Sequence, residues 1–343
     1  MGRHIQNFMQ HIWYEDSLVY WIFLPLSWLF AGLISARKII FERGILRSFT
    51  IKVPVVVVGN ITVGGTGKTP VVIWLAQQLK QRGMQPGIVS RGYGGSVGQE
   101  PMRVNSDSDP NIVGDEAVLL AQRSACPVIV HPNRVRAAQE LSGLDIDVII
   151  ADDGLQHYRL ARQFEIAVID GMRGFGNGKL FPAGPLREPV SRLESVDHTL
   201  VNKSIMCSES AISDLPTGFF VSDFYLKGTI VRSLNKREET PLTKFAGRKV
   251  HAVAALGNPS RFFRFLESHG LQVIEHTFPD HSRLTEKDLR YDDELDVLMT
   301  EKDAVKCSGL STERCWYVPV EVEVDRPQDL LNELQSRLLI QVE

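Results

Sequence analysis

One segment restricts the fold of this chain more than any other: an apolar run that leads through a Gly-rich loop into a helix. The run is Val53-Pro-Val-Val-Val-Val58, the loop ends in Gly-Lys-Thr69, and Pro70 opens the helix. Strand, loop and helix in this order are the context that a phosphate-binding P-loop requires. Glycines let backbone N–H groups point at phosphate oxygens, the lysine neutralises phosphate charge, and the threonine hydroxyl suits Mg²⁺. The predicted nucleotide-binding residues are Thr62, Val63, Gly64, Gly65, Thr66, Gly67, Lys68 and Thr69.

Apolar β-branched runs and helix-length segments alternate after the loop, as in βα units that feed a mostly parallel sheet. We predict an α/β fold of the P-loop NTPase kind, with helices flanking the sheet and a second, smaller α/β layer from Lys249. The first layer is expected to have strands at 53–58, 85–90, 128–130, 147–151, 166–170 and 198–202, and helices at 69–81, 115–123 and 134–141. The second is expected to have strands at 250–255, 273–276, 297–300 and 316–318, and helices near 259–269, 286–291 and 327–338.

The length of 343 residues suffices for about two domains. Two strand-like runs around 218–243, broken at 235–240, predict a hairpin-like connector between them. The predicted parts are an N-terminal membrane anchor with its juxtamembrane segment at 1–50, a P-loop kinase domain at 51–217, the connector at 218–243 and a C-terminal α/β domain at 244–343.

Two carboxylates follow an apolar strand, in Ile146-Asp-Val-Ile-Ile-Ala-Asp-Asp-Gly154. Acidic residues at the carboxyl end of such a strand lie near the phosphate loop, where they can hold Mg²⁺ directly or through water. Because side chains alternate along a strand, Asp152 and Asp153 face different ways. The sequence leaves open which of them is the direct ligand.

Asp115 and Glu116 begin a predicted helix, and capping of its N-terminus is the simplest role for them. His281 stands in a predicted loop, where a histidine is often just solvated. Phosphoryl transfer to an alcohol, however, requires a group that accepts the hydroxyl proton. A carboxylate oriented by a histidine suits that task.

A stretch without a charged side chain, 17–36, precedes the P-loop. At about 1.5 Å per residue, a helix of this length reaches about 30 Å, the thickness of the hydrocarbon core of a bilayer. Large apolar residues occur on all sides of the helix, so it has no polar face, and a buried core helix is the less favoured interpretation. We therefore predict membrane association.

Charges around this stretch predict its orientation. Four Lys or Arg residues follow it within 37–47, whereas Arg3 alone precedes it, so the positive-inside rule places the larger part of the chain in the cytoplasm. Glu15 and Asp16 stand where a signal peptide has its basic region, so cleavage is not expected. Pro25 leaves open whether the helix spans the bilayer or lies in one leaflet.

The formal net charge of −3 provides no overall positive field, so nucleic acid is not expected as a partner. The cysteines lie far apart, with neither a C-x-x-C pair nor zinc-ligand spacing. We interpret them as buried thiols of a reduced, cytosolic portion. They are Cys126, Cys207, Cys307 and Cys315.

Short motifs are spread over almost the whole chain. Besides the apolar anchor they are Val58-Gly-Asn-Ile-Thr-Val-Gly-Gly-Thr-Gly-Lys-Thr-Pro70, Ser90-Arg-Gly-Tyr-Gly-Gly95, Gly114-Asp-Glu116, Asp152-Asp-Gly-Leu-Gln-His157, Pro182-Ala-Gly-Pro-Leu-Arg187, Gly257-Asn-Pro259, Asp280-His281 and Thr300-Glu-Lys-Asp-Ala-Val-Lys306. Together they resemble the tetraacyldisaccharide 4′-kinases of Gram-negative bacteria, which phosphorylate a lipid A precursor at the inner membrane. Thr62, which replaces the glycine that usually begins a P-loop motif, looks typical of that family.

The resemblance implies ATP as the phosphate donor, Mg²⁺ as the metal, and the 4′-hydroxyl of a tetraacylated glucosamine disaccharide 1-phosphate as the acceptor. It implies a catalytic base at Asp115, a histidine that pairs with it across the cleft between the domains at His281, and a catalytic Lys68. It implies partners in the lipid substrate and the bilayer, no obligate protein partner, and a place on the cytoplasmic face of the inner membrane. The expected metal-site residues are Thr69, Asp152, Asp153 and Glu116, and the expected residues of the loops that line the substrate and the nucleotide are Arg91, Tyr93, Arg134 and Gln156.

Other functional classes share parts of the loop. Membrane-associated ATPase switches carry K-G-G-x-G-K-T, but Val63 replaces the signature lysine, and such switches need no hydroxyl acceptor. Asn202-Lys203 after a strand suggests a GTPase, but Ile205 replaces the aspartate expected two positions beyond the lysine. A kinase for a soluble sugar or cofactor would share the loop and have no use for the anchor.

Overall fold

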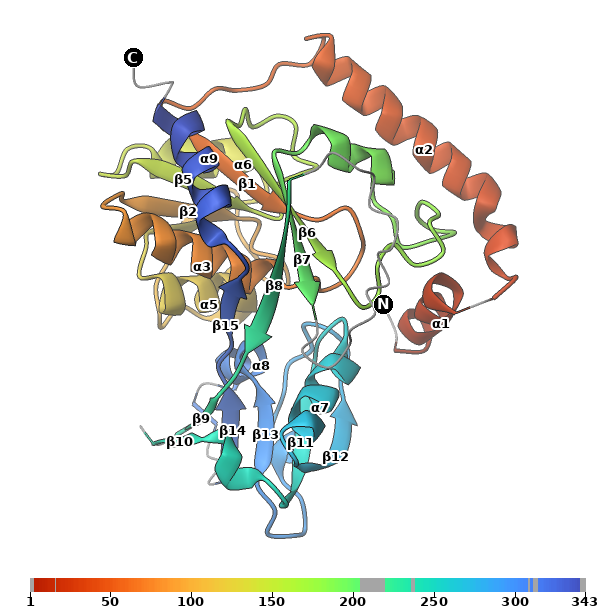
Figure 1. Ribbon diagram of the computed structural model, residues 1–343, viewed down its shortest axis with the longest axis vertical. Helices are drawn as coiled ribbons and strands as arrows, with labels where there is room; N and C mark the ends of the chain where they lie inside the picture. Colours follow the sequence, from red (N-terminus) through yellow and green to blue (C-terminus); the bar gives the residue numbers. More distant parts are fainter. Residues whose placement is uncertain are drawn as a thin grey trace.

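The structure, a computed structural model, describes residues 3–15, 17–203, 220–235, 238–307, 309–310 and 314–339. It contains two β-sheets, each flanked by helices, in a large unit and a small unit that lie end to end along the long axis of the molecule (Figure 1). The predicted α/β fold with a second, smaller layer is confirmed. Cys207 lies outside the described residues.

The large sheet has nine strands in the order β15-β8-β7-β6-β1-β5-β2-β4-β3. The inner seven run parallel, whereas β3 and β15 pair antiparallel at the two edges. The carboxyl ends of the parallel strands therefore meet at one edge of the sheet, where ligands bind in folds of this class. The strands are β1 Val55–Gly59, β2 Pro86–Ser90, β3 Met102–Val104, β4 Val128–Val130, β5 Val148–Asp152, β6 Phe164–Asp170, β7 His198–Lys203, β8 Val221–Lys227 and β15 Glu321–Val324.

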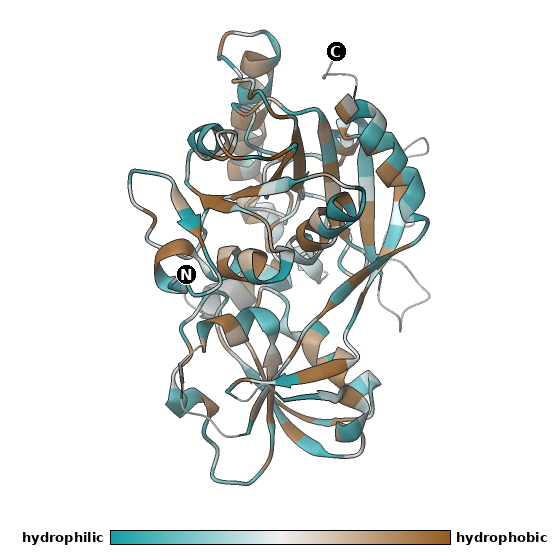
Figure 2. Ribbon diagram, turned by 90° about the vertical axis from the view of Figure 1, so that its left-hand side faces the viewer, coloured by the Kyte–Doolittle hydropathy of each residue, from teal (hydrophilic) through white to brown (hydrophobic). Residues whose placement is uncertain are grey.

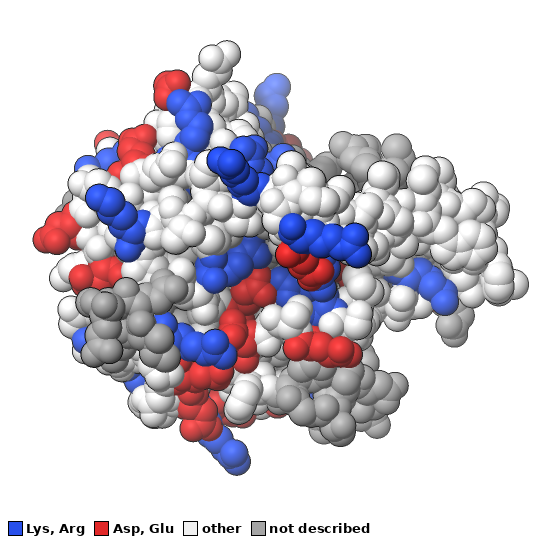
Figure 3. All heavy atoms as spheres, turned by 90° about the horizontal axis from the view of Figure 1, so that it is seen from above, with Lys and Arg blue, Asp and Glu red and all other residues white. Residues whose placement is uncertain are grey.

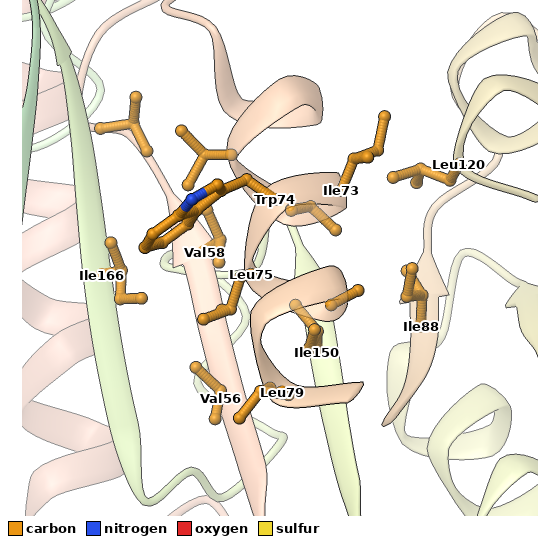
Figure 4. Packing of buried hydrophobic residues seen from close by; sticks show 14 of the residues in the cluster. Val56, Val58, Ile73, Trp74, Leu75, Leu79, Ile88, Leu120, Ile150 and Ile166 are labelled. Carbon is orange, nitrogen blue, oxygen red and sulfur yellow. The ribbon is translucent and has the colours of Figure 1, made fainter. Parts of the chain in front are cut away.

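Helices cover both faces of this sheet, which explains why its strands are continuous apolar runs rather than alternating ones. Val56 and Val58 of β1 pack with α3 on one face (Figure 4), in a cluster that also contains residues of α5 and α9, while Val55 and Val57 pack with α6 on the other. Figure 2 shows apolar residues along these strands. The helical segments of this unit are α3 Lys68–Gln81, α4 Pro110–Val113, α5 Asp115–Ser124, α6 Arg134–Leu141, the 3-10 segment η1 Val190–Ser195 and α9 Pro327–Leu339.

The small sheet has six strands in the order β10-β9-β14-β13-β11-β12; the four strands from β14 to β12 run parallel, whereas β9 and β10 pair antiparallel. One expectation fails here: the helix predicted at 286–291 is a 3-10 turn, because Thr285 and Asp288 cap each other and close a single turn. The elements are β9 Ile230–Ser233, β10 Glu239–Pro241, η2 Leu242–Phe245, β11 Lys249–Ala254, α7 Pro259–Ser268, β12 Gln272–Thr277, η3 Glu286–Leu289, β13 Val297–Thr300, α8 Glu301–Lys306 and β14 Cys315–Val318.

The chain crosses between the units twice, from β8 to β9 and from β14 to β15 (Figure 1). The crossings lie close together, because β15 pairs with β8 and a Cβ on Gly228 would lie 2.7 Å from Cγ1 of Val318. The expected hairpin is present as β9 and β10, but β8 belongs to the large sheet. The predicted domain boundaries stay a prediction, with one departure: the last segment, 321–339, returns to the large sheet.

Two helices precede β1: α1 Arg3–Tyr14 and α2 Tyr20–Glu42. The predicted apolar helix is confirmed as α2, which is long and apolar enough to cross a membrane by length and composition. It runs along the outside of the large unit (Figure 1) and leaves Trp28 68% exposed. Ser27 is instead buried and donates a hydrogen bond to the backbone oxygen of Leu180 at 2.7 Å. In α1, Ile12 and Trp13 are buried.

The described cysteines fit the interpretation as structural thiols. Cys307 and Cys315 are buried in an apolar cluster of the small unit, and the half-buried Cys126 packs against the core of the large unit. Burial raises the pKa of the Cys307 thiol to about 12, so it remains protonated at neutral pH.

Candidate active site

The Gly-rich loop joins the end of β1 to the start of α3, as its sequence predicts. Gly64 and Gly67 have φ values of +108° and +98°, a backbone region that suits glycine. A Cβ on Gly67 would lie 2.7 Å from Nδ2 of Asn202, which donates to the backbone oxygen of Thr66 at 2.9 Å. The Thr66 hydroxyl is buried without a hydrogen-bond partner among the described residues. The loop thus offers a free hydroxyl and the N-terminus of a 14-residue helix, a set of donors that fits a phosphate.

The loop opens into a cavity of about 1470 Å³. Residues 63–69 line it from the large unit, and Gly257, His281 and Lys302 line it from the small unit. Thr62 is instead buried, and its backbone pairs with Leu186 away from the cavity. Four further predicted residues, Arg91, Tyr93, Arg134 and Gln156, line the cavity as expected of binding loops.

The wall of this cavity extends to the N-terminal helices. Trp13 of α1 and Phe30 and Ile34 of α2 belong to its lining, together with the phosphate loop. Figure 3 looks down on the large unit and shows the region of α2 as a lobe nearly without charge, beside a hollow where basic and acidic side chains gather. One cavity therefore joins a polar end at the loop to an apolar end at α2.

Asp152 and Asp153 face different partners, in agreement with the alternation expected for a strand. Asp152 is the last residue of β5, beside the end of β1, and accepts a hydrogen bond from Ser90 Oγ at 3.0 Å. Burial, and then the charges of Glu116 and Asp153, raise the pKa of Asp152 to about 7. The negative charge of the Asp152 carboxylate is therefore poorly compensated by its surroundings.

Asp153 follows the strand with a φ of +47° and is paired with cations. Its carboxylate lies 3.5 Å from Lys68 Nζ and 3.1 Å from Arg187 Nη1. Burial alone would raise the pKa of Asp153, but Lys68, Arg187 and Arg134 hold it well below its usual range. Asp153 thus holds the lysine of the loop in place.

The residues around Asp152 fit Mg²⁺ without forming a complete metal site. In the described part of the chain, no three His, Cys, Asp or Glu side chains form a cluster that could hold a metal ion. Mg²⁺ commonly uses one or two carboxylates and takes its other ligands from phosphate and water. Asp152, with Thr69 on the same cavity wall, provides such a partial set. Glu116 is instead bonded to Lys302 at 2.9 Å.

Asp115 and His281, far apart in the sequence, are in contact. Nδ1 of His281 lies 3.0 and 3.1 Å from the two carboxylate oxygens of Asp115. His281 has a φ of +60°, a strained value of the kind found at functional sites. A Cβ on Gly94 would lie 3.2 Å from Nδ1 of His281, and the ring of Tyr93 meets the imidazole edge-on at 4.8 Å. The loop at 90–95 therefore packs directly on this pair.

The two members of the pair are not equivalent. His281 lines the large cavity, whereas Asp115 is 4% exposed and also borders a separate recess of about 30 Å³ behind the imidazole, shared with Lys306. Burial would raise the pKa of Asp115, but the hydrogen bond from His281 and the charges of Lys302, His281 and Lys306 lower it. Asp115 is therefore a buried carboxylate that contacts Nδ1 of a histidine lining the cavity.

Several residues of the site had no role assigned from the sequence. Lys302, Asp280 and Arg187 lie within the motifs that carry the family resemblance, but spacing alone could not give them partners. Asn202, which suggested a guanine-binding motif, supports the phosphate loop instead, and Arg261 of α7 donates to its side-chain oxygen. Arg134 donates to the backbone oxygen of Asp153 at 2.7 Å, so it also braces the site.

Comparison with known proteins gives consistent matches over the whole chain. A family model described as tetraacyldisaccharide-1-P 4′-kinase matches residues 19–339. A tetraacyldisaccharide 4′-kinase from Nitrosococcus oceani is 46% identical over 314 residues, which cover 91% of this chain and 89% of the relative. The protein of that name from Alkalilimnicola ehrlichii is 48% identical over 309 residues, which cover 90% and 89%. A crystal structure of LpxK from Aquifex aeolicus in complex with ATP has a TM-score of 0.78 at 27% identity and covers 94% of this chain and 100% of that chain.

Proposed function

This chain belongs to the family of tetraacyldisaccharide-1-P 4′-kinases, and on that premise we propose how its residues carry out the reaction. The chain is an ATP-dependent phosphotransferase of lipid A biosynthesis. It transfers the γ-phosphate of ATP to the 4′-hydroxyl of a tetraacylated glucosamine disaccharide 1-phosphate. The observation that best supports this function is the single cavity that joins the phosphate loop, the Asp115–His281 pair and the apolar helix α2.

At the phosphate end, the loop N–H groups and Lys68 bind the β- and γ-phosphates, and the Asp153 carboxylate keeps Lys68 aimed at them. Thr69 and Asp152 would hold Mg²⁺, because Asp152 has no cationic partner of its own in the described structure. When bound, Mg²⁺ would neutralise charge that develops on the phosphate oxygens. We leave Glu116 out of the metal site because Lys302 binds its carboxylate.

At the acceptor end, the Asp115–His281 pair removes the proton of the 4′-hydroxyl. The sequence suggested Asp115 as the base itself, but its place behind the imidazole favours a shared role. His281 meets the hydroxyl from the cavity, while Asp115 holds the ring at Nδ1 and stabilises the imidazolium that forms. The arrangement then favours in-line attack of the hydroxyl oxygen on the γ-phosphorus, with Lys68 countering the developing charge.

The acyl chains of the acceptor lie towards α2, which we propose rests in one leaflet on the cytoplasmic face of the inner membrane. Trp13 before the helix and Ile51 after it are both buried in the same folded body. The helix therefore cannot place its two flanks on opposite sides of a bilayer. A helix in the plane of the membrane would bury its exposed apolar side chains and bring the lipid to the cavity.

The function is tested by transfer of labelled γ-phosphate from ATP to the detergent-dispersed tetraacyl disaccharide 1-phosphate. We expect one labelled lipid product, and no product from the same disaccharide that already carries a 4′-phosphate. Hydrolysis of ATP at an equal rate with and without acceptor, with no labelled lipid, would instead favour an ATPase switch.

Polar substitution of the exposed face of α2 is expected to weaken membrane binding. We predict that Trp21→Ser, Trp28→Ser and Leu29→Ser together lower binding to phospholipid vesicles at least 30-fold, since burial of each side chain is worth about 1.5–3 kcal/mol. The kcat on substrate dispersed in detergent should change less than about threefold, because none of the three lines the cavity. Deleting 1–36 is a poorer test, because it also removes the buried Trp13.

The control is Phe220→Ser, which removes a similarly exposed apolar residue that lies outside α2, just before β8. Co-sedimentation with vesicles measures binding in each variant. Unchanged sedimentation of the triple variant would contradict the proposed leaflet position of α2.

A further inference from the structure

We propose that Lys302 is a positioning residue for phosphoryl transfer, which holds His281 in the tautomer and orientation that the acceptor hydroxyl requires. The inference rests on the proposed role of the Asp115–His281 pair and extends it to the small unit. Lys302 lies on α8, in the segment Thr300-Glu-Lys-Asp-Ala-Val-Lys306, whose role the sequence left open.

The position of Lys302 is fixed by the start of α8. Thr300 ends β13 and caps the helix by accepting the N–H of Asp303 at 3.2 Å. Asp303 is fully buried, and its Oδ2 accepts the backbone N–H of Ala255 at 3.0 Å and the hydroxyl of Thr300 at 2.7 Å. The first turn of α8 is therefore tied to the ends of β11 and β13, and Lys302 projects from it into the cavity.

The ammonium of Lys302 makes three contacts at the boundary between the units. Nζ lies 2.9 Å from Oε1 of Glu116, 3.3 Å from Oδ1 of Asp280 and 3.4 Å from Nε2 of His281. Its side chain is 15% exposed. Burial would lower the pKa of Lys302, but Glu116, Asp115 and Asp280 raise it, so the group stays charged and can only donate hydrogen bonds.

Three charged groups lie at the ring nitrogens of His281. Asp115 lies at Nδ1, while Lys302 lies at Nε2 together with Oδ1 of Asp280, which is 3.5 Å from Nε2 and is itself bonded to Lys302. The Asp115 carboxylate at Nδ1 can only accept, so Nδ1 carries the proton. Lys302 at Nε2 can only donate, so Nε2 keeps its lone pair. This is the tautomer of a neutral imidazole that can take a proton at Nε2, and the acceptor hydroxyl replaces the Lys302 ammonium at that nitrogen when it delivers its proton. A partner at the second nitrogen is the usual means of fixing a histidine tautomer.

Lys302 also links the pair to the phosphate side. Glu116 lies in the first turn of α5, in the large unit. Burial would raise the pKa of its carboxylate, but the charges of Lys302 and Lys68 lower it. Because Lys302 contacts both Glu116 and His281, it fixes the distance between the histidine and the unit that carries the phosphate loop. Lys306, one turn later, lies 2.6 Å from Asp303 and 3.8 Å from Asp115, so it supports the aspartate but does not contact the imidazole.

The test compares Lys302→Met, which keeps the length of the side chain, with the intact chain. We expect kcat to fall about 30-fold, within the range that a positioned acid–base group contributes, while KM for ATP and for the lipid changes less than about threefold. Lys302→Arg should recover part of the loss, because a guanidinium still donates to Nε2. Lys249→Met, at an exposed site on β11, is the matched control and should behave as the intact chain.

A double-mutant cycle separates positioning from a structural role. If Lys302 acts through His281, Lys302→Met should cost no further activity in a His281→Ala background. Losses that multiply, or a kcat of Lys302→Met equal to that of the intact chain, would overturn the proposal. A normal kcat for His281→Ala would refute the assigned base and the role of Lys302 with it, whereas a normal kcat for Lys302→Met alone would overturn only the role of Lys302.

The tautomer itself gives a second readout that does not depend on turnover. In protein labelled with ¹⁵N-histidine, the two ring nitrogens of His281 should show one protonated and one unprotonated shift. Lys302→Met should move them towards an average of the two tautomers if the variant retains the melting temperature of the intact chain. Unchanged shifts in a folded variant would contradict the proposed role.

Discussion

Replacing Lys68 with alanine is expected to lower kcat for lipid phosphorylation about 10³-fold. The lysine begins α3, where it adds a full charge to the partial charge of the helix N-terminus. Its side chain is 13% exposed, so the ammonium is largely desolvated. Nζ lies 3.5 Å from the Asp153 carboxylate, which fixes the direction of the side chain. Losing one preorganised charge at a phosphoryl-transfer site typically costs about 10²–10³-fold.

The measurement is kcat and KM for ATP at saturating lipid. Lys80→Ala is a suitable control, because Lys80 lies on the last turn of the same helix and donates only to the backbone oxygen of Ala125. Asp153 keeps Arg187 as a partner in the variant, so the fold should persist, with an unchanged melting temperature. A loss below tenfold would show that the loop does not bind the transferred phosphate.

Replacing Asp115 with asparagine is expected to lower kcat about 10²–10³-fold while KM for ATP stays nearly constant. The amide keeps the shape of the carboxylate but removes the charge that stabilises a protonated His281. It can also donate to Nδ1, which would shift the proton of the imidazole to the nitrogen that faces the cavity. Both effects act on the proton-transfer step rather than on nucleotide binding.

Steady-state kinetics with varied ATP and varied lipid distinguish these effects. Asp145→Asn, at an exposed carboxylate of the large unit, is the matched control. Retention of more than one-third of kcat in Asp115→Asn would rule out the pair as the acid–base group. A selective rise in KM for ATP would assign Asp115 to the nucleotide instead.

Local sequence signals predicted most of the elements. The apolar β-branched runs became strands because both faces of the large sheet are covered, and Gly64 and Gly67 of the phosphate loop stand where φ is positive. Gly114 before Asp115 likewise marks the start of a real helix. These features depend on a few neighbouring residues, which explains why the sequence alone was enough.

Contacts between distant segments could not be predicted from these local signals. Asp115 and His281 come from different units, and only the family resemblance suggested their pairing, since no spacing in the sequence encodes it. Lys302 gave no signal of its own because a lysine after a threonine and a glutamate is unremarkable until its three partners are in place. The bridge between the backbone of Thr62 and residue 186 is likewise a long-range contact that the local sequence does not encode.

The pairing of β15 with β8 also determines when the large unit can finish folding during synthesis. Strand β8 is covered on its outer side by β15, and α9 after it supplies Leu330 and Leu334 to the large core. The ribosome delivers β15 and α9 after the whole small unit. An open strand edge invites pairing with other chains. A growing chain therefore exposes this edge until β15 has been made, so the large unit becomes a finished fold only after the small unit has left the ribosome.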